Sequence, residues 1–193
     1  RHQITEEDLT WVRRYGQLLT PKLDAYKERF YQWMSSTPEF SLFFHDDRKL
    51  ERVKGAQGQF WREFFRAELD ERYVGSRRHV GEVHAHIGLS LPVYFAGINY
   101  SQDLWLYELY EGGLSEDERQ RAVRAFIKLM QLDASIVVAA YSRLTHDRLS
   151  EQAHAMMEMS TPVTSLWDHI LMLPVVGIID SRRAANMMSS VLH

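Results

Sequence analysis

The chain contains no cysteine among its 193 residues. This absence excludes disulfide bonds, thiolate metal sites and cysteine nucleophiles. Proline is scarce, and no apolar run approaches the roughly 20 residues that a membrane-spanning helix needs. The formal net charge of -3 provides no excess of positive charge for a nucleic acid or an anionic membrane surface. We therefore expect no nucleic-acid or membrane partner, and because no signal-peptide pattern opens the chain, we expect a cytoplasmic location.

The residues that are present are those of a folded protein. Apolar residues make up 45% of the chain and charged residues 25%, which is enough to bury a core. The nine histidines and the 12% of aromatic residues exceed what packing alone needs. At this length the chain can hold one domain of about 150 residues and a remainder.

Residues 1–150 are predicted to be helical. Apolar side chains recur every three or four residues, and the prolines before residue 170 stand at helix starts or breaks. Thr5 and Asp8 form a capping-box pattern, and Ser115 is followed by three acidic residues that favour a helix start. The first expected helix ends at about residue 19. Further helices are expected over about 21–35, 47–65, 71–87, 92–110 and 115–149.

The 115–149 helix carries an apolar stripe that continues for about three heptads, as in a helix-pairing seam. The stripe consists of Val123, Ile127, Met130, Ala134, Val137, Tyr141 and Leu144. The 92–110 helix adds the large aromatic residues Trp105, Tyr107 and Tyr110. We therefore expect a homodimer in which these two helices of each chain form a four-helix bundle.

The segment from Val83 to Tyr94 points to a cofactor. It reads Val83-His84-Ala85-His86-Ile87-Gly88-Leu89 and continues to Pro92 and Tyr94. Without cysteine, an iron porphyrin can be held only by histidine, methionine or tyrosine. His84 lies on the apolar side of its helix, where a neutral imidazole suits an axial ligand of haem iron. The position also suits a buried core histidine, and spacing alone favours that interpretation.

The same segment resembles the proximal part of the sensor globins, the haem domains of globin-coupled sensors. Their pattern His-x-(Arg/His)-Ile-Gly-Leu, followed by Pro and then Tyr, is matched from His84 to Tyr94. Their Phe-Tyr pair in an early helix is matched by Phe30-Tyr31, and the aromatic pair Phe43-Phe44 follows in the family's order. The resemblance covers about residues 5–150 and implies an all-α globin fold of the sensor-globin variant.

By this resemblance the cofactor is haem b, and His84 is the axial ligand of the iron. Tyr31 would donate a hydrogen bond to a gas that gains negative charge on binding, as dioxygen does, whereas carbon monoxide would profit much less. The alternative for Tyr31 is a core aromatic residue with its hydroxyl at the surface. Tyr94 would lie near the imidazole, either as its hydrogen-bond partner or as a core aromatic residue. The other haem-pocket residues that we expect are Phe30, Phe43, Phe44, Leu50, Val53, Ala56, Gln57, Val80 and Ile87, with an exposed position as the alternative for Gln57.

The chain changes character after residue 150. We expect a polar helical linker over 151–159, a buried strand over 171–179 and an amphipathic helix from Asp180. The pattern Leu-Pro-Val-Val-Gly-x-x-Asp-Ser-x-Arg-Ala, which begins at residue 173, resembles the start of a STAS domain in stressosome scaffold proteins. It implies that 160–193 is the N-terminal fragment of an α/β STAS domain. It also makes Ser181 a possible phosphorylation site, although Ser181 can equally be a plain helix cap.

These resemblances predict a haem-based gas sensor, for dioxygen above other diatomic gases, that regulates a STAS output in a stressosome-type complex. The expected partners are then STAS-domain proteins and a kinase, and no enzymatic activity is expected. Three alternatives stay open: a haem-free globin-fold scaffold, a haem enzyme, and a globin-coupled sensor with another output such as a cyclic-dinucleotide synthase. His84 and Tyr31 together favour haem binding over the haem-free scaffold.

Overall fold

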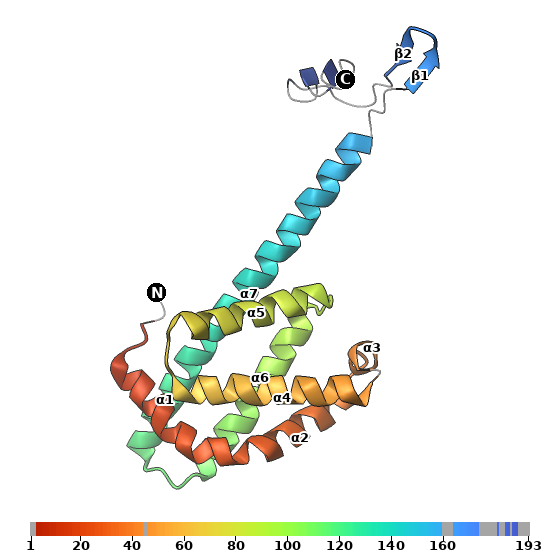
Figure 1. Cartoon of the computed structure of the whole chain (residues 1–193). Helices are drawn as coiled ribbons and strands as arrows, with labels where there is room; N and C mark the ends of the chain where they lie inside the picture. Colours follow the sequence, from red (N-terminus) through yellow and green to blue (C-terminus); the bar gives the residue numbers. More distant parts are fainter. Residues whose placement is uncertain are drawn as a thin grey trace. The chain divides into compact units, whose positions relative to one another are not determined.

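The structure is a computed structural model that describes residues 3–44, 46–159, 164–173, 181, 184–185 and 187–188. The chain divides into two compact units, Arg1–Arg143 and Leu144–His193. The helices, drawn in Figure 1, are α1 (Glu6–Leu19), the 3-10 turn η1 (Thr20–Lys22), α2 (Leu23–Ser35), α3 (Phe40–Phe43), α4 (Asp47–Arg66), α5 (Glu71–His86), α6 (Leu91–Glu111) and α7 (Glu116–Met159). The predicted helices of residues 1–150 are confirmed.

Side-chain caps set several of these boundaries. The Thr5 hydroxyl accepts a hydrogen bond from the Asp8 amide at 3.2 Å, and the Asp8 carboxylate accepts one from the Thr5 amide at 2.8 Å, so the predicted capping box forms. Ser115 and Glu118 cap the start of α7 in the same reciprocal way. After α5, Gly88 adopts a φ of +72°, a left-handed conformation that favours glycine and ends the helix.

Aromatic side chains fill the core of the first unit. Tyr26 of α2 stacks on Trp105 of α6 with ring centroids 4.4 Å apart, and Trp61 of α4 meets both rings edge-on. Phe64 and Phe126, both fully buried, join α4 to α7 at 5.3 Å. Offset and edge-to-face pairs of this kind add to the stabilisation that comes from burying the rings. This core accounts for much of the aromatic excess in the composition.

The apolar stripe of α7 is divided between the interior and the surface. The members buried within the chain's own core are Met130, Ala134 and Val137. Trp105, expected as a surplus aromatic residue of α6, is also buried. The large apolar residues of the two helices that stay exposed include Ile127, Tyr107 and Tyr110. The central positions of the stripe therefore pack onto the rest of α7's own unit, and the homodimer through the remaining exposed positions stays a prediction.

In the second unit, α7 continues without a break over the predicted linker, residues 151–159. Two short strands, β1 (Thr164–Trp167) and β2 (Ile170–Met172), then pair antiparallel. The described part of the strand expected over 171–179 is exposed rather than buried, and residues 174–180 lie outside the described residues. Ser181 is exposed. In the described residues no helix combines the length and apolar character needed to cross a membrane.

Candidate functional site

His84 lies in the last turn of α5 as a largely buried imidazole. Its Nδ1 atom is shielded from solvent and has no hydrogen-bond partner. Burial lowers the pKa of His84 from its ordinary value of 6.5 to about 4, because the apolar surroundings disfavour the charged ring. The imidazole is therefore neutral at physiological pH, which is the form that binds a metal ion. By contrast, His86 is exposed and its Nδ1 lies 2.8 Å from the Glu82 carbonyl oxygen.

Tyr94, in the first turns of α6, is the aromatic neighbour of His84. The two ring centroids are 5.4 Å apart and the rings are tilted by 54°. No hydrogen bond joins the two side chains in the structure, so Tyr94 contacts the imidazole through its ring. Burial raises the pKa of the Tyr94 hydroxyl, which keeps it protonated.

Tyr31 lies on α2 in an aromatic cluster with Phe30 and Phe44. Its ring centroid is 5.4 Å from that of Phe30 and 6.1 Å from that of Phe44, and the Lys54 ammonium lies 5.7 Å from it. The side chain is only 6% exposed, and its hydroxyl bonds to no residue that the structure describes. Burial raises the pKa of this hydroxyl, and the nearby Glu51 carboxylate adds to the shift. Tyr31 is thus a protonated donor that the protein itself leaves unused.

The residues expected along α4 have different environments. Leu50 and Val53 are partly buried against the core, whereas Ala56 is exposed. Gln57 is half-buried rather than exposed: its Nε2 donates to the Tyr26 hydroxyl at 3.3 Å, and its Oε1 is shielded without a partner. The Gln57 Oε1 is therefore a buried acceptor without a partner on the inner side of α4.

The other expected pocket residues are less enclosed. Val80 and Phe43 are half-buried, and Ile87, directly after α5, is 42% exposed. The structure thus brings His84 into contact with Tyr94, and Tyr31 into contact with Phe30 and Phe44. It leaves Ala56 and Ile87 at surface positions, and their place in a pocket stays a prediction.

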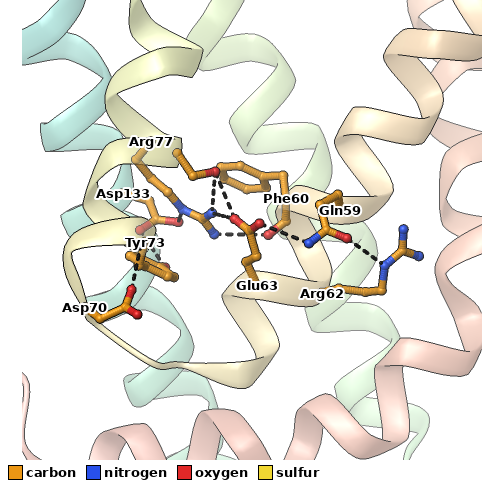
Figure 2. Close-up of polar contacts among 9 residues, drawn as sticks. Gln59, Phe60, Arg62, Glu63, Asp70, Tyr73, Arg77 and Asp133 are labelled. Atoms are coloured by element: carbon orange, nitrogen blue, oxygen red, sulfur yellow. Dashed lines mark hydrogen bonds and ion pairs between the residues drawn. The ribbon is translucent and has the colours of Figure 1, made fainter.

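A buried polar cluster, which the sequence analysis missed, is centred on Arg77, a residue of the same helix as His84 (Figure 2). Arg77 is fully buried and donates to Asp133 at 2.9 Å, to Glu63 at 2.8 Å and to the Phe60 carbonyl oxygen at 3.0 Å. The Tyr73 hydroxyl donates to the second oxygen of Asp133 at 2.7 Å. A signal was present, because helical spacing puts Arg77 seven residues before His84 on the same face of α5.

The charges of this cluster are balanced by direct contacts. Burial raises the pKa of the Asp133 carboxyl, and hydrogen bonds from Tyr73 and Arg77 offset part of that effect. Burial would also raise the pKa of Glu63, but hydrogen bonds from Gln59 and Ser76, with the charge of Arg77, hold it below its usual range. A buried guanidinium with two carboxylates and two aromatic faces is stable only as a complete set.

The first unit is an all-α globin fold, and the comparisons with known proteins identify the family. The protoglobin family matches residues 2–146, and the chain belongs to that family. Among solved structures, the globin domain of a Geobacter sulfurreducens globin-coupled sensor is similar with a TM-score of 0.68 and 21% identity, over 72% of this chain and 92% of that chain. The globin domain of E. coli DosC in its ferric form is similar with a TM-score of 0.62 and 16% identity, over 71% of this chain and 91% of that one. Its ferrous form gives a TM-score of 0.61 at 16% identity, over 70% and 90% of the two chains.

Haem b is the cofactor of protoglobins and of the globin domains of globin-coupled sensors. The residues around His84 fit that cofactor. The imidazole is neutral and largely buried, and its Nδ1 has no hydrogen-bond partner. Apolar side chains close to it or to Tyr94 in the sequence are exposed: Val83, Ile87 and Phe95. Porphyrin covers such apolar surface when it binds against a proximal helix. His84 therefore has the chemistry of an iron ligand, and its role as that ligand stays a prediction. The predictions of a globin fold and of haem b are confirmed at the level of the family.

Proposed function

We propose that this protein is a haem-based sensor of a diatomic gas, and that the gas is dioxygen. The observation that carries the proposal is the largely buried, neutral imidazole of His84, whose Nδ1 has no hydrogen-bond partner, in a chain of the protoglobin family. Tyr31 supports dioxygen: its side chain is largely buried and its hydroxyl bonds to no described residue, so this donor is free to bond a ligand that gains negative charge.

When bound, haem supplies an iron centre that coordinates a diatomic gas reversibly. The chain's own residues decide where and how this happens. His84 of α5 would hold the iron, and contact with Tyr94 restricts the orientation of the imidazole ring. The Tyr31 hydroxyl stays protonated and can donate a hydrogen bond, and Phe30 and Phe44 fix the phenol ring by edge-on packing. These roles are binding roles, and we propose no enzymatic reaction for the domain.

The assignment of His84 is tested by His84→Ala with His86→Ala as the matched control. Both variants remove a histidine from the end of α5, but only His84 is buried and without a partner. We expect stoichiometric haem and a gas-dependent absorption spectrum in the wild type and in His86→Ala. We expect neither in His84→Ala, with helical circular dichroism retained. Full haem with an unchanged spectrum in His84→Ala would mean that another residue holds the iron and that the proposal is wrong.

We also propose a homodimer through α6 and the first part of α7. The exposed residues Ile127, Tyr107 and Tyr110 support it, and a hollow of about 440 Å³ lies beside Tyr110 and the α7 residues from Glu116 to Lys128. Burying such side chains against a second copy removes apolar surface from water. Light scattering at low micromolar concentration should give twice the chain mass of 22.7 kDa. Ile127→Asp should reduce it to the monomer, whereas Leu18→Asp, an equally exposed leucine on α1, should not.

The output of the sensor is proposed on the sequence pattern at residues 173–184 alone. It supports a STAS output in a stressosome-type complex, with Ser181 as the residue that a partner kinase phosphorylates. A globin-coupled sensor with a different output is the alternative. Mass spectrometry of the chain after incubation with a STAS-directed kinase should find phosphate on Ser181 and none in Ser181→Ala. An unmodified Ser181 would favour another output.

A further inference from the structure

Helix α5 is tied to helix α7 by three consecutive contacts, which we call the α5–α7 seam. Its residues are Tyr73, Arg77 and Gly81 on α5, and Asp133, Val137 and Ala140 on α7. The contact positions rise together along both helices, so α5 and α7 run in the same general direction where they meet. The Arg143 guanidinium and the Glu82 carboxylate, 3.8 Å apart, add an exposed ion pair at the same junction.

Arg77 is the centre of this seam. The guanidinium carbon lies 4.1 Å from the ring centroid of Phe60 and 3.9 Å from that of Tyr73, and the side chain is fully buried. Its Nε donates to Asp133 of α7, and its two terminal nitrogens donate to α4 (Figure 2). The planar guanidinium can bond in three directions at once with a fixed geometry, which a lysine ammonium on a flexible stem does not provide. Arg77 therefore fixes the position of α5 against two other helices.

Gly81 transmits this fixed position toward His84. A side chain at residue 81 would overlap the Val137 carbonyl oxygen and come within 2.9 Å of the Ala140 Cβ, so the α5 backbone rests directly on α7 there. His84 follows three residues later, less than one turn along α5, and seven residues after Arg77, which is about two turns. A helix held at Arg77 and in backbone contact at Gly81 has little freedom to move at His84 without moving α7.

We propose that Arg77 is a positioning residue of the haem site: together with Asp133 and the close contact at Gly81 it couples the helix that carries His84 to α7, so that a displacement of His84 on gas binding is passed to α7. This inference rests on the proposed function, because the displacement would begin at the haem that His84 would hold. It goes beyond that function by naming the contact that carries the movement away from the site. The coupling is mechanical, since packed helices shift as bodies rather than deform continuously.

The test replaces the buried pair by apolar residues of similar size in the full chain loaded with ferrous haem. Arg77→Met with Asp133→Leu removes both charges together, because removing one partner alone would leave a buried charge and destabilise the fold. Lys128→Met is the matched control: Lys128 pairs with Asp8 at 2.8 Å and so ties the same helix α7 to α1 instead of to α5. Asp133→Asn is the milder second variant: it keeps the volume and an acceptor for Tyr73, and Arg77 keeps its ion pair with Glu63.

Two readouts separate positioning from a merely structural role. Resonance Raman of the ferrous protein reports the iron–histidine stretching band, and backbone hydrogen exchange reports the response of α7 residues 130–143 to carbon monoxide. In the double variant we expect the iron–histidine band to shift or broaden. We also expect the change in hydrogen exchange of α7 on carbon monoxide binding to be at least about twofold smaller than in the wild type. Residues that carry coupling between sites typically change it by about 2- to 30-fold. Lys128→Met should keep the wild-type band and response. If the double variant does not fold, Asp133→Asn should show the same changes at smaller amplitude.

The outcomes distinguish this inference from the proposed function. A wild type that binds haem and carbon monoxide, together with a double or Asp133→Asn variant whose band and α7 response match the wild type, would overturn the coupling through Arg77 and leave the sensor proposal intact. A wild type that binds gas without any response in α7 would overturn it as well. A wild type that forms no haem complex would overturn the proposed function, and this inference with it.

Discussion

Replacing Tyr31 by phenylalanine removes a single hydroxyl from a site that the protein otherwise encloses. The side chain is 6% exposed, and the rings of Phe30 and Phe44 pack against it edge-on. Because the hydroxyl bonds to no described residue, its removal breaks no hydrogen bond within the described part of the chain. Tyr31→Phe should therefore leave the free energy of unfolding of the haem-free protein unchanged or slightly higher.

The effect on gas binding should be much larger than the effect on stability. A hydrogen bond to a charged acceptor contributes about 1.5–3 kcal/mol, which corresponds to roughly a 10- to 100-fold change in a dissociation rate. Dioxygen release should accelerate by this factor. Carbon monoxide release should change by about threefold or less, because that ligand gains little negative charge and a neutral hydrogen bond contributes about 0.5–1 kcal/mol.

Stopped-flow and flash-photolysis rates for both gases measure the difference, and Tyr26→Phe is the matched control. Tyr26 lies five residues earlier on α2 and is equally buried, but its hydroxyl is already engaged by Ser101 at 2.8 Å and Gln57 at 3.3 Å. Tyr26→Phe should cost about 1–3 kcal/mol of stability and leave the ratio of the two gas rates unchanged. Equal acceleration of both gases in Tyr31→Phe, or a selective effect on dioxygen in Tyr26→Phe, would refute the reasoning.

Substitutions at three further positions test the fold that supports the site. Gly81→Ala should lower the melting temperature and weaken haem retention, because the alanine Cβ would overlap the Val137 carbonyl oxygen. An unchanged melting temperature would show that α5 and α7 do not pack this closely at residue 81. Asp8→Asn should destabilise the protein at neutral pH, where the Asp8 carboxylate pairs with Lys128. Burial would raise the pKa of Asp8, but the bonds from Lys128 and Thr5 lower it below its ordinary value of 3.8. The difference in free energy of unfolding between wild type and variant should therefore disappear only when the pH falls below that value and Asp8 becomes protonated. Urea unfolding at a series of pH values measures this difference. Ser115→Ala should cost about 1 kcal/mol and Ser115→Gly only a few tenths; an equal loss would argue against a capping role.

Much of the fold could be predicted from local sequence signals. The capping boxes at Thr5 and Ser115 and the glycine after α5 act within one turn of chain, so they have the same effect whatever the rest of the molecule does. The proximal pattern around His84 and the Phe30-Tyr31 pair pointed to the globin family, which the family match to residues 2–146 then confirmed. The pattern beyond residue 173 stays a prediction.

Other features were decided only when the helices packed against one another. Periodicity showed that Met130, Ala134 and Val137 form one apolar face, but it could not show whether that face meets the same chain or another, and packing buries it within the chain. Gln57 was open to two interpretations until Tyr26, from another helix, gave its amide a partner.

The polar cluster shows the same division most clearly. Residue type alone would place Arg77 and Asp133 at the surface, since charged side chains are rarely buried without a partner. Their partners lie on different helices, 56 residues apart in the chain, and only the tertiary structure brings the two charges to 2.9 Å. The sequence by itself determined the helices and their ends, and it singled out His84 as the predicted ligand of the iron. The tertiary structure decided which charges could be buried together, because the cost of removing a charge from water is offset only by a partner at contact distance.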